Sequence, residues 1–244
     1  MDNTNWFKQG SDQPLFPDLL WSKPESKHSS GKLLIVGGNL HSFTAPAAAY
    51  AAALQAGVGA TRVFMPDVLK KYFRQLSGPT MELEYGESTP SGSFARTALS
   101  KLIEEAEWAD GVLLIGDFGR NSETAVLLDS FTKKYRGQLT VGGDALDYFL
   151  ASDALTSRND SAMVINLGKL QKLAKSVRPS TPVLHSMSLY ELVTVLADWT
   201  NGSEAIIVTM HTDNYLVAVN GRVSTTPVKT SQDWQIELAV YSAV

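Results

Sequence analysis

The sequence contains no cysteine. This absence excludes disulfide bonds, thiolate nucleophiles and cysteine zinc sites, and it suits the reducing environment of the cytoplasm, where we expect the protein to be located. Histidine is scarce as well, and the four histidines include no close pair at the spacing of metal ligands. We therefore predict no metal site formed by side chains.

Positive charge is not concentrated anywhere along the chain. The 21 lysines and arginines are outnumbered by 25 aspartates and glutamates, which gives a net charge of −4. A surface with this charge does not attract a nucleic-acid backbone. We therefore expect no nucleic-acid partner.

Long hydrophobic runs are missing too. The most apolar stretch, residues 45–60, is mostly alanine, contains Gln55, and is shorter than the roughly 20 residues that cross a bilayer. Residues 1–10 are polar and have no apolar core of the kind that a secretory signal requires. The sequence thus predicts a soluble protein that does not insert into a membrane.

The apolar residues that are present follow the pattern of an α/β protein. Hydrophobic residues make up 44% of the chain, enough to bury a core without disulfides. Residues 33–36 form a continuous apolar run that Gly37-Gly38 ends, which is typical of a strand buried on both faces. The alanine-rich segment 45–56 and the apolar segment 60–65 predict a helix and a second strand. Such a unit pairs its strands in parallel, with a right-handed crossover.

The alternation continues along the chain. Further strands are predicted at residues 111–115, 138–141, 162–165 and 205–209, with a short one at 182–184. Further helices are predicted at residues 95–106, 122–135, 144–151, 167–176 and 189–199. Asn220-Gly221 lies between two short β-type segments and predicts a hairpin. We expect an α/β fold with a doubly wound, mainly parallel sheet, helices on both faces and a C-terminal β-hairpin. Residues 1–32 are expected to form an arm and residues 33–244 the domain.

In open α/β sheets the ligand crevice lies beyond the carboxyl ends of the strands. The segments to inspect are therefore residues 37–46, 116–124, 142–147, 166–169 and 209–211. Gly37-Gly38 lets the backbone approach a ligand, although two glycines also form an ordinary tight turn. Residues 116–120 could hold an anion on backbone N–H groups and Arg120, or could be a simple connection. Asp144 could contact a ligand or cap a helix.

The absence of three common sequence motifs argues against several enzyme classes. The chain has no Gly-x-Ser-x-Gly nucleophile elbow, no phosphate-binding loop ending in Gly-Lys-Ser/Thr, and no Gly-x-Gly-x-x-Gly. Residue chemistry and spacing alone therefore predict only an α/β domain with a crevice formed by loops.

The order of motifs resembles that of the ADP- or ATP-dependent NAD(P)H-hydrate dehydratases, which have a ribokinase-like fold and repair hydrated nicotinamide cofactors. The opening motifs that carry the resemblance are Lys27-x-x-x-Gly31-Lys32, the strand ending at Gly37-Gly38, Ala45-Pro46, and Gly57-Val58-Gly59. Later motifs follow in the same order, at residues 115–120, 142–146, 166–169 and 230–233. The resemblance covers nearly the whole chain.

The resemblance implies a role for individual residues. Asp233 would be the catalytic acid/base residue. Ala45, Gly119, Asn166 and Asp144 would contact the hydrated NADH or NADPH substrate. The nucleotide, ADP or ATP with Mg²⁺, would be bound by Thr209 and Gln232. The backbone of Gly37 and Gly38 would line the first loop. Because members of this family assemble through helices, a homo-oligomer is also expected.

Several positions depart from the family pattern. Asn166 replaces a histidine, Lys169 replaces a glutamate, and Thr209 replaces a lysine. Ser231 and Gln232 replace glycines that present N–H groups to phosphate in the family. Three functions stay open on this basis. The first is a nucleotide-dependent dehydratase, and the second is a non-catalytic binding or assembly module without a phosphate site. The third is a kinase that uses Asp233 to deprotonate a small-molecule hydroxyl.

Overall fold

The computed structural model describes residues 5–10, 15–20, 26, 29–73, 82–177, 181–228 and 233–243. The chain divides into two compact units. One unit contains Glu25–Tyr148 together with Ile236–Val244 and is called the 25–148 unit below. The other contains Met1–Pro24 and Phe149–Gln235 and is called the 149–235 unit.

The sheet of the 25–148 unit is entirely parallel. Its strands lie in the order β6 (Gln138–Gly142), β5 (Gly111–Ile115), β2 (Lys32–Val36), β3 (Ala60–Pro66) and β4 (Glu82–Gly86). Every residue of β5 is buried, as expected for a central strand covered on both faces. Because the strands are parallel and adjacent, their carboxyl ends meet at one edge.

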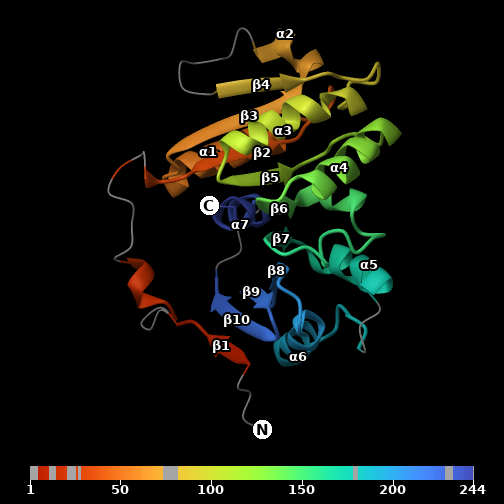
Figure 1. Cartoon of the computed structure of the whole chain (residues 1–244). Helices are drawn as coiled ribbons and strands as arrows, with labels where there is room; N and C mark the ends of the chain where they lie inside the picture. The colour runs from red at the N-terminus through yellow and green to blue at the C-terminus, as the bar shows by residue number, and fades with distance from the viewer. Residues whose placement is uncertain are drawn as a thin grey trace. The chain divides into compact units, whose positions relative to one another are not determined.

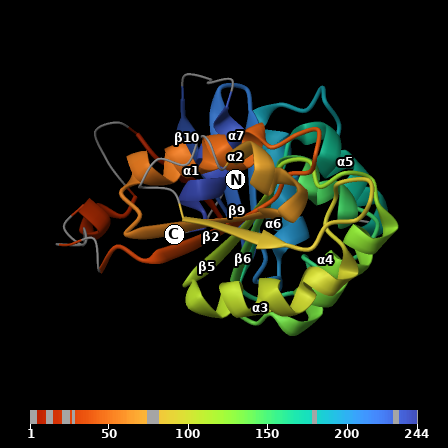
Figure 2. The same cartoon turned by 90° about the horizontal axis from the view of Figure 1, so that it is seen from above.

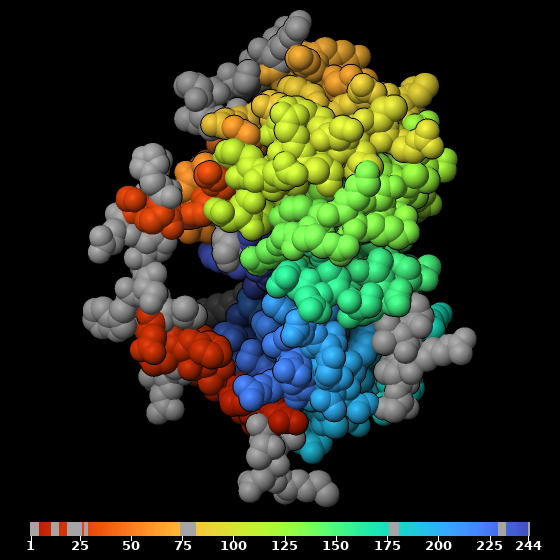
Figure 3. Space-filling view, viewed as in Figure 1, coloured from red at the N-terminus to blue at the C-terminus, as the bar shows by residue number. Residues whose placement is uncertain are grey.

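Helices cover both faces of this sheet. Helix α1 (Thr44–Ala56) lies on one face, and α3 (Leu99–Trp108) and α4 (Ser122–Lys134) lie on the other (Figure 2). Helices α3 and α4 pack against each other, and their outer surfaces adjoin in the space-filling view (Figure 3). Shorter helices are η3 (Asp67–Leu69), α2 (Lys70–Phe73), η4 (Arg96–Ala98) and η5 (Gly143–Tyr148). Helix α7 (Trp234–Tyr241) enters this unit at Ile236.

The sequence defines the ends of these helices. The side chain of Asn121 caps α4, because its Oδ1 accepts a hydrogen bond from the backbone N–H of Glu123 at 2.8 Å. Lys133 and Lys134 lie in the last turn of α4, where they interact favourably with the helix dipole. Helix α1 ends at Gly57, whose φ of 81° is the left-handed conformation that glycine adopts at low cost.

The sheet of the 149–235 unit is mixed. Its strand order is β1 (Trp6–Lys8), β10 (Arg222–Pro227), β9 (Asn214–Val219), β8 (Ile206–His211) and β7 (Ser161–Val164) (Figure 1). The pairs β7–β8 and β1–β10 are parallel, whereas the pairs β8–β9 and β9–β10 are antiparallel. The helices are η1 (Pro17–Leu20), α5 (Leu167–Val177) and α6 (Leu189–Thr200). Asn220 and Gly221 both have positive φ, as a two-residue hairpin turn requires.

Most expected elements are present, and the predicted mainly parallel sheet with helices and a C-terminal hairpin is confirmed. Two local predictions were wrong. Residues 182–184 form no strand, and the helix expected at 144–151 is the shorter 3₁₀ helix η5. Among the described residues, no helix is long and apolar enough to span a bilayer. The division into an arm at 1–32 and a domain at 33–244 stays a prediction.

Candidate functional site

Three glycine-containing connections meet at the carboxyl ends of β2, β5 and β6. Gly37 follows β2, Gly116 follows β5, and Gly143 follows β6. A β-carbon on Gly116 would lie 2.8 Å from that of Ala45, and one on Gly37 would lie under 3.0 Å from the carbonyl oxygen of Ile115. Only small residues fit here, so the structure brings the predicted residues Gly37 and Ala45 together with Gly116. We call these residues the glycine cradle.

Asn39 joins the loop after β2 to the loop after β5. Its side chain is buried, its Nδ2 donates to the backbone carbonyl of Asp117 at 3.0 Å, and its Oδ1 accepts from the backbone N–H of His41 at 2.8 Å. The N–H of Asn39 also donates to the carbonyl of Ser42 at 2.9 Å. The turn that contains Gly38 therefore has a fixed connection to residues 116–121.

Residues 116–121, called the Gly119 loop below, are held by hydrogen bonds within the loop. The N–H of Gly119 donates to Oδ1 of Asp117 at 2.7 Å, and its carbonyl accepts from the N–H of Asn121 at 3.0 Å. Gly119 has a φ of 72°, and the hydroxyl of Ser93 occupies the space that a β-carbon would need. In the part of the chain that the structure describes, the N–H groups of Phe118 and Arg120 have no acceptor. Such backbone N–H groups can bind an anion or water.

Tyr148 contacts the Gly119 loop from η5. Its hydroxyl donates a hydrogen bond to the carbonyl of Gly119, and its ring meets that of Phe118 edge to face, with centroids 6.3 Å apart. Burial raises the pKa of the Tyr148 phenol above its ordinary value of about 10. Sequence reasoning missed this residue, although it lies only four positions after the predicted Asp144. Asp144 itself is exposed in the first turn of η5.

The other predicted residues lie in the 149–235 unit. Asn166 follows β7 and caps α5, because its Oδ1 accepts from the N–H of Lys169 at 2.9 Å. Thr209 lies in β8 and is completely buried. Its hydroxyl has no hydrogen-bond partner among the described residues. The pairing of Val164 with Val208 shows that β7, which Asn166 follows, and β8, which contains Thr209, are adjacent parallel strands.

Asp233 precedes α7 and is exposed. The next residue, Trp234, stacks on Tyr215 of β9, with ring centroids 6.2 Å apart. Gln232, the second predicted nucleotide-binding residue, lies outside the described residues. No group of three or more histidine, aspartate or glutamate side chains within the described ranges could hold a metal ion.

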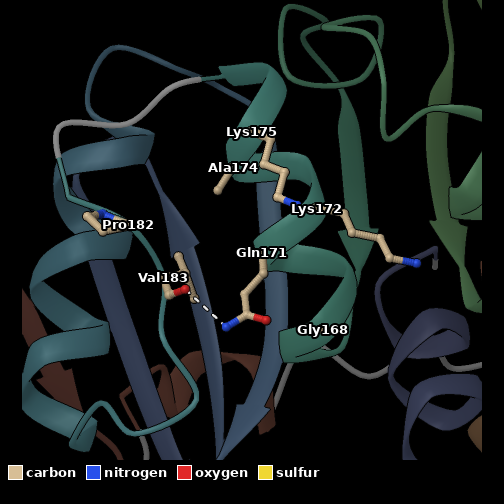
Figure 4. Close-up of a pocket in the computed structure, with 7 residues that line it drawn as sticks. All are labelled: Gly168, Gln171, Lys172, Ala174, Lys175, Pro182 and Val183. Atoms are coloured by element: carbon tan, nitrogen blue, oxygen red, sulfur yellow. Dashed lines mark hydrogen bonds between the residues drawn. The ribbon is translucent and has the colours of Figure 1, made fainter.

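A separate pocket of about 570 Å³ lies beside α5 in the 149–235 unit. Figure 4 shows Gln171 pointing from α5 toward Val183, and its Nε2 donates to the Val183 carbonyl at 3.1 Å. The other lining residues are Gly168, Lys172, Ala174, Lys175 and Pro182. Gly168 belongs to the predicted segment 166–169, but none of the described residues that were assigned an individual role lines this pocket.

The comparison with known proteins begins with sequence. No family model matches the chain. A segment of 101 residues is 36% identical to the bifunctional NAD(P)H-hydrate repair enzyme Nnr of Methanothermobacter thermautotrophicus. This segment is 41% of the present chain but only 18% of the relative's length.

Similarity to solved structures identifies the fold of the chain. A ribokinase-like superfamily protein from Enterococcus faecalis V583 superposes with a TM-score of 0.69 at 14% identity, covering 98% of this chain and 79% of that protein. The chain has the ribokinase-like fold. An ADP/ATP-dependent NAD(P)H-hydrate dehydratase from Bacillus subtilis, co-crystallised with ATP and Mg²⁺, gives a TM-score of 0.57 at 12% identity, covering 88% of this chain and 72% of that protein. The resemblance predicted from the sequence is thus confirmed.

Proposed function

We propose that the chain is a nucleotide-dependent dehydratase that acts on hydrated NADH or NADPH. The observation that carries this proposal is the combination of the glycine cradle with the Gly119 loop. The cradle allows a ligand to approach the backbone closely, and the loop offers the N–H groups of Phe118 and Arg120. Such a loop suits an anionic ligand, and the diphosphate of a dinucleotide is one. The similarity to the repair enzyme and to the dehydratase supports the same substrate class.

Thr209 fits a role in binding ADP or ATP. A buried hydroxyl without a partner costs free energy, which a polar ligand atom would recover once neighbouring side chains had moved to expose the hydroxyl. In the proposed assignment Thr209 and Gln232 would hold the nucleotide, and Asn166 and Asp144 would contact the hydrated nicotinamide. The nucleotide phosphate, bound with Mg²⁺, would supply the activation of the hydroxyl that leaves.

The remaining chemistry is an elimination, in which the activated hydroxyl would leave as the phosphate that the nucleotide has given up, so that the elements of water are removed overall. A C–O bond and a neighbouring C–H bond break, and a C=C bond of the dihydronicotinamide ring is restored. The proton must be accepted by a base, and we assign this role to Asp233. Its exposed position before α7 leaves the carboxylate open to a ligand.

A second candidate function is a non-catalytic binding module. The burial of Thr209 supports it, because a nucleotide would reach the hydroxyl only after neighbouring side chains moved. In this alternative the fold and the Gly119 loop persist, but no nucleotide-driven reaction takes place.

Thermal unfolding with and without ADP, ATP and Mg²⁺ separates the two candidates. A nucleotide at about 100 times its Kd would add roughly 2.7 kcal/mol to the free energy of unfolding. For a chain of this size, that corresponds to a rise of roughly 5–11 °C. A rise of this order supports the dehydratase. No rise at millimolar nucleotide supports the non-catalytic module.

The second step is an activity assay that follows the absorbance of regenerated NADH. We expect Asp233→Asn to abolish turnover with an unchanged Tm. Asp153→Asn is the matched control, because Asp153 is also an exposed aspartate of the 149–235 unit but has no proposed role. Turnover that survives Asp233→Asn would show that the acid/base assignment is wrong.

A further inference from the structure

Tyr148 contacts the Gly119 loop from η5 through its side chain, so substitution can remove this contact without changing the backbone. Its hydroxyl donates to the carbonyl of Gly119, and its ring packs edge to face against Phe118. Neither residue is close to Tyr148 in sequence. The contact therefore connects two separate carboxyl-end connections of the sheet, those after β5 and β6.

The hydrogen bond from the Tyr148 hydroxyl occupies the Gly119 carbonyl and so limits which backbone groups of the loop remain for a ligand. A carbonyl oxygen accepts two hydrogen bonds, and that of Gly119 accepts from both the Tyr148 hydroxyl and the Asn121 N–H. The N–H of Gly119 is used by Asp117. Within the described part of the loop, the unpaired backbone groups near Gly119 include the donors of Phe118 and Arg120.

Two other contacts fix the loop from different directions. Asn39 donates to the carbonyl of Asp117, and Ser93 fills the space beside the α-carbon of Gly119. Tyr148 provides the third contact. These three contacts restrict the loop to the conformation that presents its donors, and such preorganisation lowers the cost of binding.

We propose that Tyr148 is a positioning residue, which holds the Gly119 carbonyl so that the loop presents N–H donors to an anionic ligand. This inference rests on the proposed function, because the ligand is the hydrated dinucleotide. The phenol is protonated at neutral pH, as the ordinary tyrosine pKa of about 10 requires, and the hydroxyl is therefore available as a donor.

The test is Tyr148→Phe, which removes the hydroxyl and keeps the ring. Tyr135→Phe is the matched control, because Tyr135 is a largely buried tyrosine of the same unit whose hydroxyl donates to the backbone carbonyl of Gln138 at 3.4 Å. That carbonyl begins β6, at the end of the strand opposite to the loop. Both variants are compared with the wild-type chain.

The first measurement is amide hydrogen exchange of residues 116–121 in the ligand-free protein. Loss of one hydrogen bond should speed exchange in this loop by about 3- to 10-fold in Tyr148→Phe, and not in Tyr135→Phe. The second is steady-state kinetics with hydrated NADH at saturating ADP or ATP. We expect KM to rise by about 3- to 10-fold in Tyr148→Phe, with kcat and Tm nearly unchanged.

The two measurements separate the inference from the proposed function. Unchanged exchange, or faster exchange with an unchanged KM, would overturn the positioning role. A wild-type chain that neither turns over hydrated NADH nor responds to nucleotide would overturn the proposed function. The exchange experiment would then still show whether Tyr148 holds the loop.

Discussion

Replacing Gly116 by alanine should destabilise the protein for two reasons that the structure separates. Gly116 has a φ of 87°, and an L-residue in the left-handed region loses about 1–2 kcal/mol. The added β-carbon would also lie 2.8 Å from that of Ala45 and 3.3 Å from Cδ of Pro46, whereas ordinary contacts begin at 3.4 Å. Overpacking of this kind costs about 1–3 kcal/mol.

We therefore expect Gly116→Ala to lower the free energy of unfolding by about 3 kcal/mol. For a chain of this length the midpoint should fall by roughly 6–12 °C, which circular dichroism can follow during heating. The matched control is Gly57→Ala. Gly57 has a φ of 81°, and nothing lies within 4 Å of the position of its β-carbon, so this variant has the backbone strain without the overpacking.

A third variant identifies the atom responsible. Ala45→Gly removes the β-carbon that Gly116→Ala would meet, so the double variant should recover part of the loss that the sum of the two single variants predicts. If Gly116→Ala costs no more than Gly57→Ala, the cradle is not closely packed and the reasoning is refuted. A double variant with strictly additive losses would show that Ala45 is not the neighbour that matters.

Three further predictions follow from single contacts. Ser188→Ala should lower stability by about 1 kcal/mol, because Ser188 forms a capping box with Glu191 at the start of α6; an unchanged urea midpoint would contradict this. Thr124→Val should cost about 1–3 kcal/mol, since the buried Thr124 hydroxyl donates to the Phe94 carbonyl at 2.7 Å; thermal unfolding would test it. The raised pKa of Tyr148 implies stability that is present below about pH 10, the ordinary tyrosine pKa, and is lost as pH rises through the folded-state pKa. Unfolding measured between about pH 9 and pH 11 should therefore show a smaller loss in Tyr148→Phe than in the wild type.

The core of the fold could be predicted because its signals are local. The apolar run that ends at Gly37 forms β2, and Asn220-Gly221 forms the turn of the β9–β10 hairpin. Two strands were not predicted. Strand β4 alternates glutamate with Leu83 and Tyr85, which is a short strand signal that the prediction missed. Strand β1 has three residues, and its partner β10 lies at the other end of the chain, so only the folded structure brings them together.

The residues of the candidate site also divide into those that the sequence predicted and those that it did not. Gly37 was predicted because glycine after a strand permits close backbone contact, and Ala45 and Gly119 were predicted through the resemblance to the dehydratases. Asn39 and Tyr148 were missed because their roles depend on partners in other connections. Tyr148 and Gly119 are 29 positions apart, and nothing in the residues between them predicts that a phenol meets that carbonyl.

The departures from the family pattern affect the two groups of candidate residues differently. The 25–148 unit offers a ligand backbone N–H groups, and side-chain replacement elsewhere in the chain does not remove them. Thr209, the described candidate of the 149–235 unit for binding ADP or ATP, would act through its side chain, which differs from the lysine of the family. We therefore expect binding of the hydrated dinucleotide to be less affected than binding of ADP or ATP. Calorimetric titration with each ligand alone tests this order, and tight nucleotide binding with no dinucleotide binding would contradict it.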